Sequence, residues 1–250
     1  MNFFSLFKRN IIYNLKKKKS IDNENFTNKS LDELFFLYGS DKANHFSKEN
    51  RVGHGYSKYY INHLEKYKND NISILEIGSF AGASAAAFSK YFKNSNIYCF
   101  DINISNFYYK SKNIKVFGLD INNKKKVNNT IMKIFETNQI NNFDVIIDDG
   151  SHYLSDILGS LNFFFKHLKK NGYYIIEDYK HPNYYQYNRD INHIFVDEFL
   201  NNIKENKISV STIFTDQEQE DLIKLTKKID IYKGNLKDSD ICFITKKTTK

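Results

Sequence analysis

Acidic residues and one histidine gather in two short strings whose chemistry fits a single site. The first string, Asp148 to His152, reads Asp-Asp-Gly-Ser-His, and the second is the pair Glu177-Asp178. Carboxylates held close together repel one another, and a hard divalent cation such as Mg²⁺ relieves that repulsion through oxygen ligands. A cation there lowers the pKa of a bound hydroxyl, and a histidine titrates near neutrality, as a general base must.

Both strings follow apolar runs with the length and β-branched content of buried strands. Between the runs lie stretches with helical periodicity. The runs are 72–77, 97–102, 114–117, 143–147 and 173–176, and the helical stretches are 83–93, 123–138 and 154–170. This alternation predicts right-handed βαβ units and a parallel sheet with helices on both faces. Ligands of such sheets bind at the carboxyl ends of the strands, where the two strings lie.

The rest of the chain completes this α/β domain, which we expect to span residues 31–250. A further helix fits 190–206. The apolar segments 229–232 and 241–245 flank Gly234-Asn235 and predict a late hairpin of strands. Residues 208–226 show no clear pattern.

A glycine loop closes the first run and opens a helix rich in small residues. It reads Glu76-Ile-Gly78-Ser79-Phe-Ala-Gly82, and its two glycines let the backbone approach a ligand closely. The spacing differs from the GxGxxG of dinucleotide folds, which counts against a nicotinamide enzyme. Asp101, about 20 residues later, is placed to accept hydrogen bonds from ribose hydroxyls, as in other nucleotide-binding sheets.

The glycine loop, Asp101 and the later acid Asp120, each after its own run, resemble class I S-adenosylmethionine-dependent methyltransferases. The resemblance covers about residues 70 to 180. It implies a Rossmann-like, mostly parallel seven-stranded sheet with a late antiparallel hairpin. It also implies that the loop faces methionine and ribose, that Asp101 binds ribose and that Asp120 neighbours adenine. The expected cofactor-binding residues are Glu76, Gly78, Ser79, Gly82, Asp101, Asp120 and Asp148.

The acidic strings resemble a narrower group, the metal-dependent sugar O-methyltransferases of macrolide tailoring and the related enzymes called cephalosporin hydroxylases. That resemblance implies Mg²⁺ held by Asp149, Glu177 and Asp178, with His152 as the catalytic base beside Asp149. The string Tyr38 to Lys42 (Tyr-Gly-Ser-Asp-Lys) also recurs in the group. Here a polar insert at 43–53 delays the His-Gly-Tyr string that follows it.

Other interpretations of these residues stay open from sequence. A histidine at position 152 is also compatible with an ordinary surface role, and Glu177-Asp178 with capping or turn roles. The string Tyr38 to Lys42 fits a turn with a structural ion pair as well as a ligand contact. Tyrosines 184, 185 and 187 fit either an aromatic wall for a sugar ring or a packed loop.

Positive charge concentrates at the start of the chain. Six of the eight net positive charges lie in residues 1–20, which contain no acid, so the remainder carries +2. Apolar residues at helical spacing precede the lysines, which predicts an amphipathic helix and a polar linker within residues 1–30. The helix either touches an anionic membrane surface or packs on its own domain or on a partner. The reversed order of charge and apolar residues argues against a secretory signal.

These features favour a cytoplasmic enzyme, with an inner-membrane surface as its alternative location. The expected acceptor is a hydroxyl or phosphate-type oxygen of a sugar, glycan or other polar small molecule, in polysaccharide or natural-product decoration. Nucleic acid is not expected, since the body lacks a basic stripe. Two alternatives remain, namely metal-independent N-methylation and a non-catalytic, membrane-associated module that senses the cofactor. Two cysteines, each in an apolar run, exclude a disulfide-stapled fold.

Overall fold

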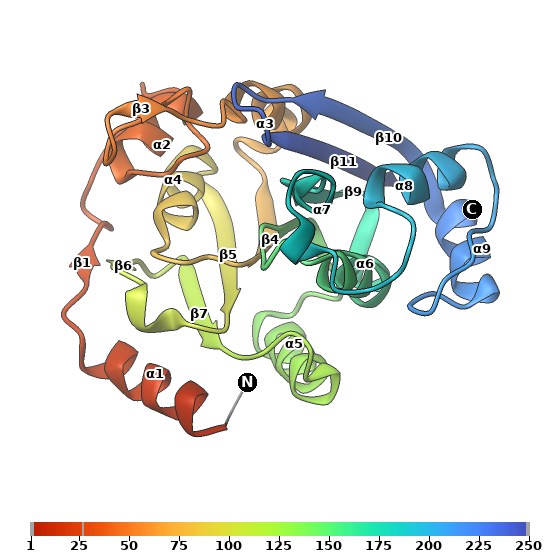
Figure 1. Ribbon diagram of the computed structural model, residues 1–250. Helices are drawn as coiled ribbons and strands as arrows, with labels where there is room; N and C mark the ends of the chain where they lie inside the picture. Colours follow the sequence, from red (N-terminus) through yellow and green to blue (C-terminus); the bar gives the residue numbers. More distant parts are fainter. Residues whose placement is uncertain (1–2, 27, 249–250) are drawn as a thin grey trace.

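Seven strands form the central sheet of the computed structural model, which describes residues 3–26 and 28–248, with the side chain of Phe3 outside the description (Figure 1). Their order is β10-β11-β9-β8-β4-β5-β7. The four neighbouring pairs from β9 to β7 are parallel, whereas β11 runs antiparallel to both β9 and β10. The bounds are β4 Asn71–Ile77, β5 Asn94–Asp101, β7 Ile114–Gly118, β8 Phe143–Asp148, β9 Leu168–Glu177, β10 Thr226–Lys233 and β11 Asp240–Lys246. The predicted parallel sheet and late hairpin are confirmed.

Side chains alternate between the two faces of the sheet, so each face carries its own apolar core. Ile74 and Val145 pack on one side with α2 (Leu31–Tyr38), α3 (Ser57–Leu64) and α4 (Ala83–Tyr91). Leu75 and Ile146 pack on the other side with α5 (Lys124–Asn138), α6 (Leu154–Phe164) and α8 (Val196–Lys204). The strands are therefore buried on both faces, which explains their continuous apolar runs.

Two of the expected helices have different bounds in the structure, and one further helix was not expected. The helix expected over 154–170 ends at Phe164, and after a 3₁₀ turn, η3 (Phe165–His167), strand β9 already begins at Leu168. The strand starts with the polar residues 169–171, which mask its pattern in the sequence. The helix expected over 190–206 is the shorter α8. The segment without a clear pattern contains α9 (Asp216–Leu225), which begins with a capping box between Thr215 and Glu218.

The N-terminal segment packs on the domain. Helix α1 (Phe3–Leu15) lies beside η2 (Ile104–Asn106), and β1 (Lys19–Ser20) pairs in parallel with β6 (Tyr109–Lys110) (Figure 1). Ile21, within the expected linker, is fully buried. Among the described residues, no helix is long and apolar enough to cross a membrane.

Four short elements lie around the carboxyl edge of the sheet. The insert at 43–53 forms a small hairpin of β2 (His45–Phe46) and β3 (Arg51–Val52). At the same edge, α7 (His181–Tyr184) and η4 (Gln186–Asn188) follow β9, whereas the 3₁₀ turn η1 (Glu65–Tyr67) lies between α3 and the start of β4. The hairpin and α7 thus flank the edge at which the acidic strings end.

Candidate active site

The glycine loop and the acidic string meet where the sheet reverses its strand order, between β4 and β8. The Gly78 N–H donates to the Phe100 carbonyl (2.8 Å), and the Asp149 N–H donates to the Ile77 carbonyl (2.9 Å). Gly78 has a φ of +83°, and a Cβ there would lie 1.9 Å from the Asp149 carbonyl oxygen. Only glycine fits this position without displacing the backbone. The glycine loop and the first acidic string are therefore in direct contact through their main chains.

Two cavities lie on either side of Gly78. One, of about 190 Å³, is lined by Gly78, Asp101, Asp120 and Gly150 among others. The other, of about 410 Å³, is lined by Gly78, Ser79, Lys42 and Asp149 together with the β2–β3 hairpin. Gly82 caps the start of α4 beside the glycine loop, with a left-handed φ of +77°. Of the expected cofactor residues, Asp101 and Asp120 line the smaller cavity, Ser79 lines the larger one, and Gly78 lines both.

Asp101 and Asp120 both organise loops at this edge. Asp101 accepts backbone N–H bonds from Phe80 (2.7 Å) and Asn103 (2.5 Å), which ties the glycine loop to the end of β5. Asp120 accepts the Asn122 N–H at 3.0 Å. A carboxylate has about four acceptor positions, and both side chains line the smaller cavity.

Glu76 and Asp148, also expected at the cofactor, lie deeper. Glu76 is fully buried, and burial raises its pKa to about 7. Its Oε1 accepts the Ser84 hydroxyl, whereas its Oε2 has no partner among the described residues. Asp148 is buried and accepts the Tyr174 hydroxyl at 3.4 Å, and burial raises its pKa to about 7. Asp148 is not among the residues that line either cavity.

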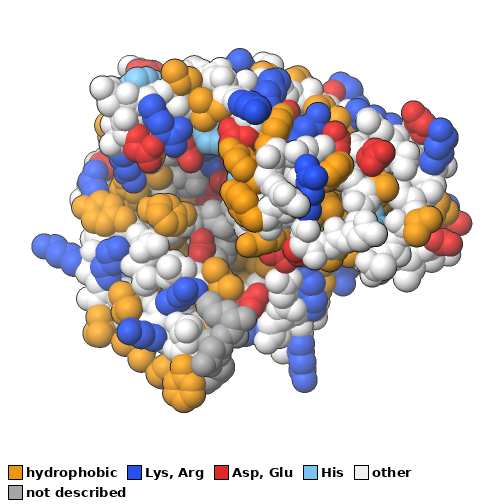
Figure 2. Space-filling model, in the orientation of Figure 1, with side chains coloured by type: hydrophobic (Ala, Val, Ile, Leu, Met, Phe, Trp, Pro, Cys, Tyr) orange, Lys and Arg blue, Asp and Glu red, His pale blue; other side chains and the backbone are white. Residues whose placement is uncertain are grey.

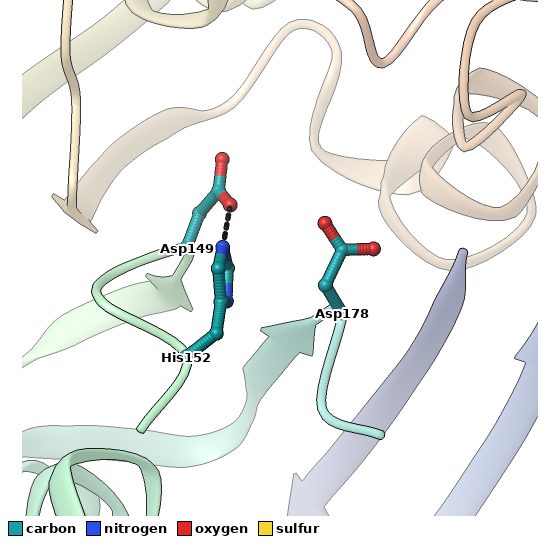
Figure 3. A group of neighbouring side chains, drawn as sticks. All are labelled: Asp149, His152 and Asp178. Atoms are coloured by element: carbon teal, nitrogen blue, oxygen red, sulfur yellow. Dashed lines mark ion pairs between the residues drawn. The ribbon is translucent and has the colours of Figure 1, made fainter. Parts of the chain in front are cut away.

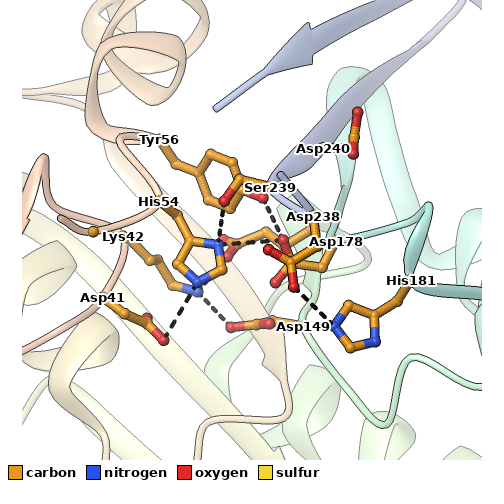
Figure 4. Close-up of polar contacts among 12 residues, drawn as sticks. Asp41, Lys42, His54, Tyr56, Asp149, Asp178, His181, Asp238, Ser239 and Asp240 are labelled. Carbon is orange, nitrogen blue, oxygen red and sulfur yellow. Dashed lines mark hydrogen bonds and ion pairs between the residues drawn. The ribbon is translucent and has the colours of Figure 1, made fainter. Parts of the chain in front are cut away.

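A buried lysine joins the two acidic strings. Lys42 Nζ lies 2.5 Å from Asp149 Oδ2 and 2.6 Å from Glu177 Oε2 (Figure 4 shows the Lys42–Asp149 contact). Burial would lower the pKa of Lys42, but the two carboxylates raise it well above its usual value. The Tyr60 hydroxyl donates to the second Glu177 oxygen. The string Tyr38 to Lys42 therefore supplies an ion pair that also lines the larger cavity.

Asp178 has a separate set of partners. It accepts the Tyr56 hydroxyl, and its Oδ1 lies 3.3 Å from His54 Nδ1 (Figure 4). Burial opposes a charged imidazole, but the hydrogen bond and charge of Asp178 outweigh it and raise the pKa of His54 to about 9. For Asp178, burial alone would raise the pKa, but the hydrogen bond and charge of His54 hold this pKa below its usual value. His54-Gly55-Tyr56, the delayed string of the sequence, thus reaches the acidic corner.

Asp149, His152 and Asp178 fit the requirements of a metal site. One ligand atom from each lies within 4.8 Å of the others, and His152 Nε2 is 3.7 Å from Asp149 Oδ1 (Figure 3). His152 (φ 59°) and Asp178 (φ 50°) both adopt left-handed backbone conformations, which cost energy in residues other than glycine and cluster at functional sites. The oxygen-rich set suits a hard divalent cation. Glu177 belongs to the same corner, but Lys42 and Tyr60 engage its two oxygens.

The three tyrosines after β9 lie in different surroundings. Tyr184 and Tyr185 donate their hydroxyls to Asp240 (2.8 Å) and Asp238 (2.7 Å), as expected of a packed loop. Tyr187 is 66% exposed, and the His181 ring lies between those of Tyr185 and His152 (centroids 4.4 and 5.1 Å away). Sequence reasoning did not identify Tyr60 or His181. Tyr60 carries only the apolar periodicity of α3, and His181 has no metal-like spacing in the chain.

Comparisons with known proteins agree with this geometry. A family profile described as a methyltransferase domain matches residues 75–179. The mycinamicin VI 2''-O-methyltransferase of Micromonospora griseorubida is 26% identical over 132 residues, which are 50% of this chain and 31% of that enzyme. The L-olivosyl-oleandolide 3-O-methyltransferase of Streptomyces antibioticus is 28% identical over 157 residues, 59% of this chain and 36% of that enzyme. The chain therefore spans about a third of the length of these relatives.

A solved structure shares the fold over most of the chain. The MycE methyltransferase of the mycinamycin biosynthetic pathway, in complex with Mg, SAH and mycinamycin VI, superposes with a TM-score of 0.67 and 19% identity. The match covers 88% of this chain and 55% of that one. Residues 75–179 accordingly match a methyltransferase-domain profile, and the chain has the α/β fold of this methyltransferase structure.

Proposed function

We propose that the protein transfers a methyl group from S-adenosylmethionine to an oxygen of a sugar or another polar small molecule, with the help of Mg²⁺. The observation that carries this proposal is the position of His152 and Asp149 beside Asp178, with Asp149 lining the larger cavity. The relatives named as O-methyltransferases, and the MycE complex with Mg and SAH, support it.

The cofactor would lie across Gly78. In the smaller cavity Asp101 would accept hydrogen bonds from ribose hydroxyls, and Asp120 would lie near adenine. Gly78, Ser79 and Gly82 would face the methionine part, whose ammonium group suits the buried Glu76 carboxylate behind the loop. Asp148 would act indirectly: it would hold in place the backbone of Gly150, which lines the smaller cavity.

Asp149 and Asp178 would hold the metal directly, and Glu177, also expected as a ligand, would support them from the core through its contacts with Lys42 and Tyr60. When bound, Mg²⁺ would orient an acceptor hydroxyl and lower its pKa. His152 is placed to take the hydroxyl proton at Nε2, the atom that faces Asp149. The acceptor oxygen then forms a bond to the methyl carbon while the carbon–sulfur bond breaks, which leaves a neutral thioether. Correct alignment of oxygen and methyl supplies much of the acceleration.

The acceptor would enter by the larger cavity. Phe46, Lys48, Glu49 and Arg51 of the insert line it, and this mixture of aromatic and charged groups suits a polar acceptor with several hydroxyls. We place the reaction in polysaccharide or natural-product decoration, where a phosphate-type oxygen is the second acceptor class. A nucleic-acid acceptor is not proposed, because the body outside residues 1–20 carries only +2 of the net charge.

Substitution of the catalytic pair tests this function. We expect Asp149→Asn and His152→Ala to lower methyl transfer at least about a thousandfold, because each removes a group that acts on the reacting oxygen. Transfer is measured by mass spectrometry with mycinamicin VI and a panel of nucleotide-linked sugars. Binding of S-adenosylhomocysteine, measured by calorimetry, should change less than about threefold in both variants. His45→Ala, in the exposed hairpin, is the matched control.

The outcomes separate the alternatives. Full activity in either variant would rule out the mechanism, and activity that persists in excess EDTA would favour metal-independent N-methylation. Cofactor binding without any methylated product across the panel would favour a sensing module.

We also propose that α1 contacts an anionic membrane surface, which places the enzyme at the cytoplasmic face of the inner membrane. Polar side chains of α1 and of the residue after it bind the domain. Arg9 donates to the Ile102 carbonyl (3.1 Å), and Lys16 donates to the Ser105 carbonyl (3.1 Å). Its apolar residues face outward, and Figure 2 shows them at the lower left with basic side chains beside them. The exposed fractions are 76% for Phe4, 55% for Phe7, 42% for Ile11 and 81% for Leu15. Vesicle binding tests this contact.

A further inference from the structure

Lys42 is a buried lysine in the middle of the acidic corner. Its side chain is 3% exposed, and those of its partners Asp149 and Glu177 are 22% and 2% exposed. Its ammonium group contacts one oxygen of each carboxylate, at 2.5 and 2.6 Å. Backbone hydrogen bonds hold the loop before and after Lys42. The His54 N–H donates to the Asp41 carbonyl (2.7 Å), and the Tyr56 N–H donates to the Lys42 carbonyl (2.9 Å). Lys42 is therefore held in place by the backbone as well as by its partners.

The charges around Lys42 explain why the corner needs it. Five carboxylates gather here: those of Glu76, Asp149, Glu177 and Asp178 come from the carboxyl ends of three neighbouring strands, and that of Asp41 precedes Lys42 in the chain. Asp178 has its own partners in Tyr56 and His54. Asp149 and Glu177 share Lys42, and a buried carboxylate without a compensating charge is strongly destabilising.

The two carboxylates that share Lys42 also face different neighbours. Asp149 turns its second oxygen toward His152, in the group that could hold a metal. Glu177 turns its second oxygen toward the Tyr60 hydroxyl, inside the core. Lys42 thus links Asp149, which lines the larger cavity, to Glu177, which is buried in the core.

We infer that Lys42 is the built-in cation of the corner, a positioning residue that holds Asp149 and Glu177 in place and supplies part of the positive charge that a divalent cation completes. This inference deepens the proposed function and rests on its metal site. It implies that the corner without Lys42 depends on the metal for its stability.

The variant Lys42→Met tests the inference, because it keeps the length of the side chain and removes its charge. In EDTA we expect the midpoint of thermal unfolding to fall on the order of 10 °C. Added Mg²⁺ should recover most of that loss, so the Mg²⁺-induced rise should exceed that of the unaltered protein. Calorimetry should show Mg²⁺ binding on the order of tenfold tighter, since a neighbouring positive charge is gone.

Lys246→Met is the matched control. Lys246 is also a buried lysine, but its ammonium group donates to the carbonyls of Phe165 (3.1 Å) and Leu168 (2.8 Å), away from the corner. Its loss should lower the midpoint equally in EDTA and in Mg²⁺. The same metal-independent loss in Lys42→Met, or a loss of its Mg²⁺ binding, would overturn the inference.

A double variant covers the case in which Lys42→Met does not fold. Lys42→Met with Glu177→Gln removes one positive and one negative charge together, so we expect it to be more stable in EDTA than Lys42→Met alone. A double variant no more stable than the single one would also overturn the inference. Failure of the unaltered protein to bind Mg²⁺ would instead contradict the proposed metal, and the double variant would still decide the role of Lys42.

Discussion

The absence of a side chain at position 78 allows the two halves of the site to meet. The left-handed φ of Gly78 turns the chain at the end of β4, and its Cα faces the Asp149 carbonyl. The same residue borders both cavities, so the backbone there would approach the cofactor on one side and the acidic string on the other. The small size of residue 78 therefore allows the cofactor site and the acidic string to lie next to each other.

Gly78→Ala should weaken the cofactor site. A Cβ 1.9 Å from the Asp149 carbonyl oxygen must displace the glycine loop or the acidic string. We expect S-adenosylhomocysteine binding to weaken at least about tenfold, and the free energy of unfolding to fall by about 1–3 kcal/mol. Calorimetry and urea unfolding measure the two effects.

Gly159→Ala provides the control for this substitution. Gly159 lies inside α6, and a Cβ there meets no atom within 4 Å. Alanine should raise the free energy of unfolding by about 0.5–1 kcal/mol, because it favours the helix more than glycine does. Unchanged cofactor binding in Gly78→Ala would contradict the role of this residue.

At the scale of elements, the N-terminal segment is tied to the domain by short contacts. β1 adds a two-residue parallel pair to β6, and Ile21 follows it into the core beside α2 and α4. Asp22 then accepts the Ser111 hydroxyl at 2.6 Å. These contacts position α1 beside η2, close to the smaller cavity, since Ile102 both lines that cavity and accepts a hydrogen bond from Arg9.

Ile21→Ala should show that this segment belongs to the folded unit. Ile21 is 0% exposed, so the truncation leaves a cavity, and we expect the free energy of unfolding to fall by about 2–4 kcal/mol. Ile208→Ala, at a residue 45% exposed, should change it by less than about 1 kcal/mol. Urea unfolding that gives equal values for the two variants would mean that the segment contributes nothing to stability.

At the scale of the whole molecule, the two signs of charge are separated. The net positive charge lies mainly on α1 and the lysines that follow it, and the acidic corner lies between the carboxyl ends of the strands. Because α1 faces outward with an apolar stripe, the molecule presents one basic and apolar surface suited to anionic lipid.

Vesicle flotation measures this property of the intact protein. We expect binding to phosphatidylcholine vesicles that contain about 30% phosphatidylglycerol, and little binding to pure phosphatidylcholine. Ile11→Ser with Leu15→Ser should weaken binding at least about tenfold, because two apolar side chains no longer enter the interface. Salt at about 0.5 M should also weaken it through screening.

Val210→Ser is the control for these substitutions, since Val210 is 95% exposed but lies between α8 and α9. It should bind like the unaltered protein. Equal binding to neutral and anionic vesicles would contradict an electrostatic contact.

The sequence by itself determined the sheet, its parallel centre and its late hairpin, because buried strands need continuous apolar runs and these are visible along the chain. It also determined which residues follow each strand, and so the candidates Gly78, Asp101, Asp149, His152 and Asp178. The first residues of β9 and the whole of α9 were not predicted from the sequence. Polar residues near the start of a strand, and a short capped helix, carry little periodicity.

Only the tertiary structure decided which partners these candidates have. Lys42 lies 107 residues before Asp149 and 135 before Glu177, and no local pattern reports a contact over such separations. The same holds for Tyr60 and for the packing of residues 19–22 on the domain. Strand ends are set by local sequence, but the charges that neutralise one another in the corner are brought together by the packing of α2 and α3 on the sheet.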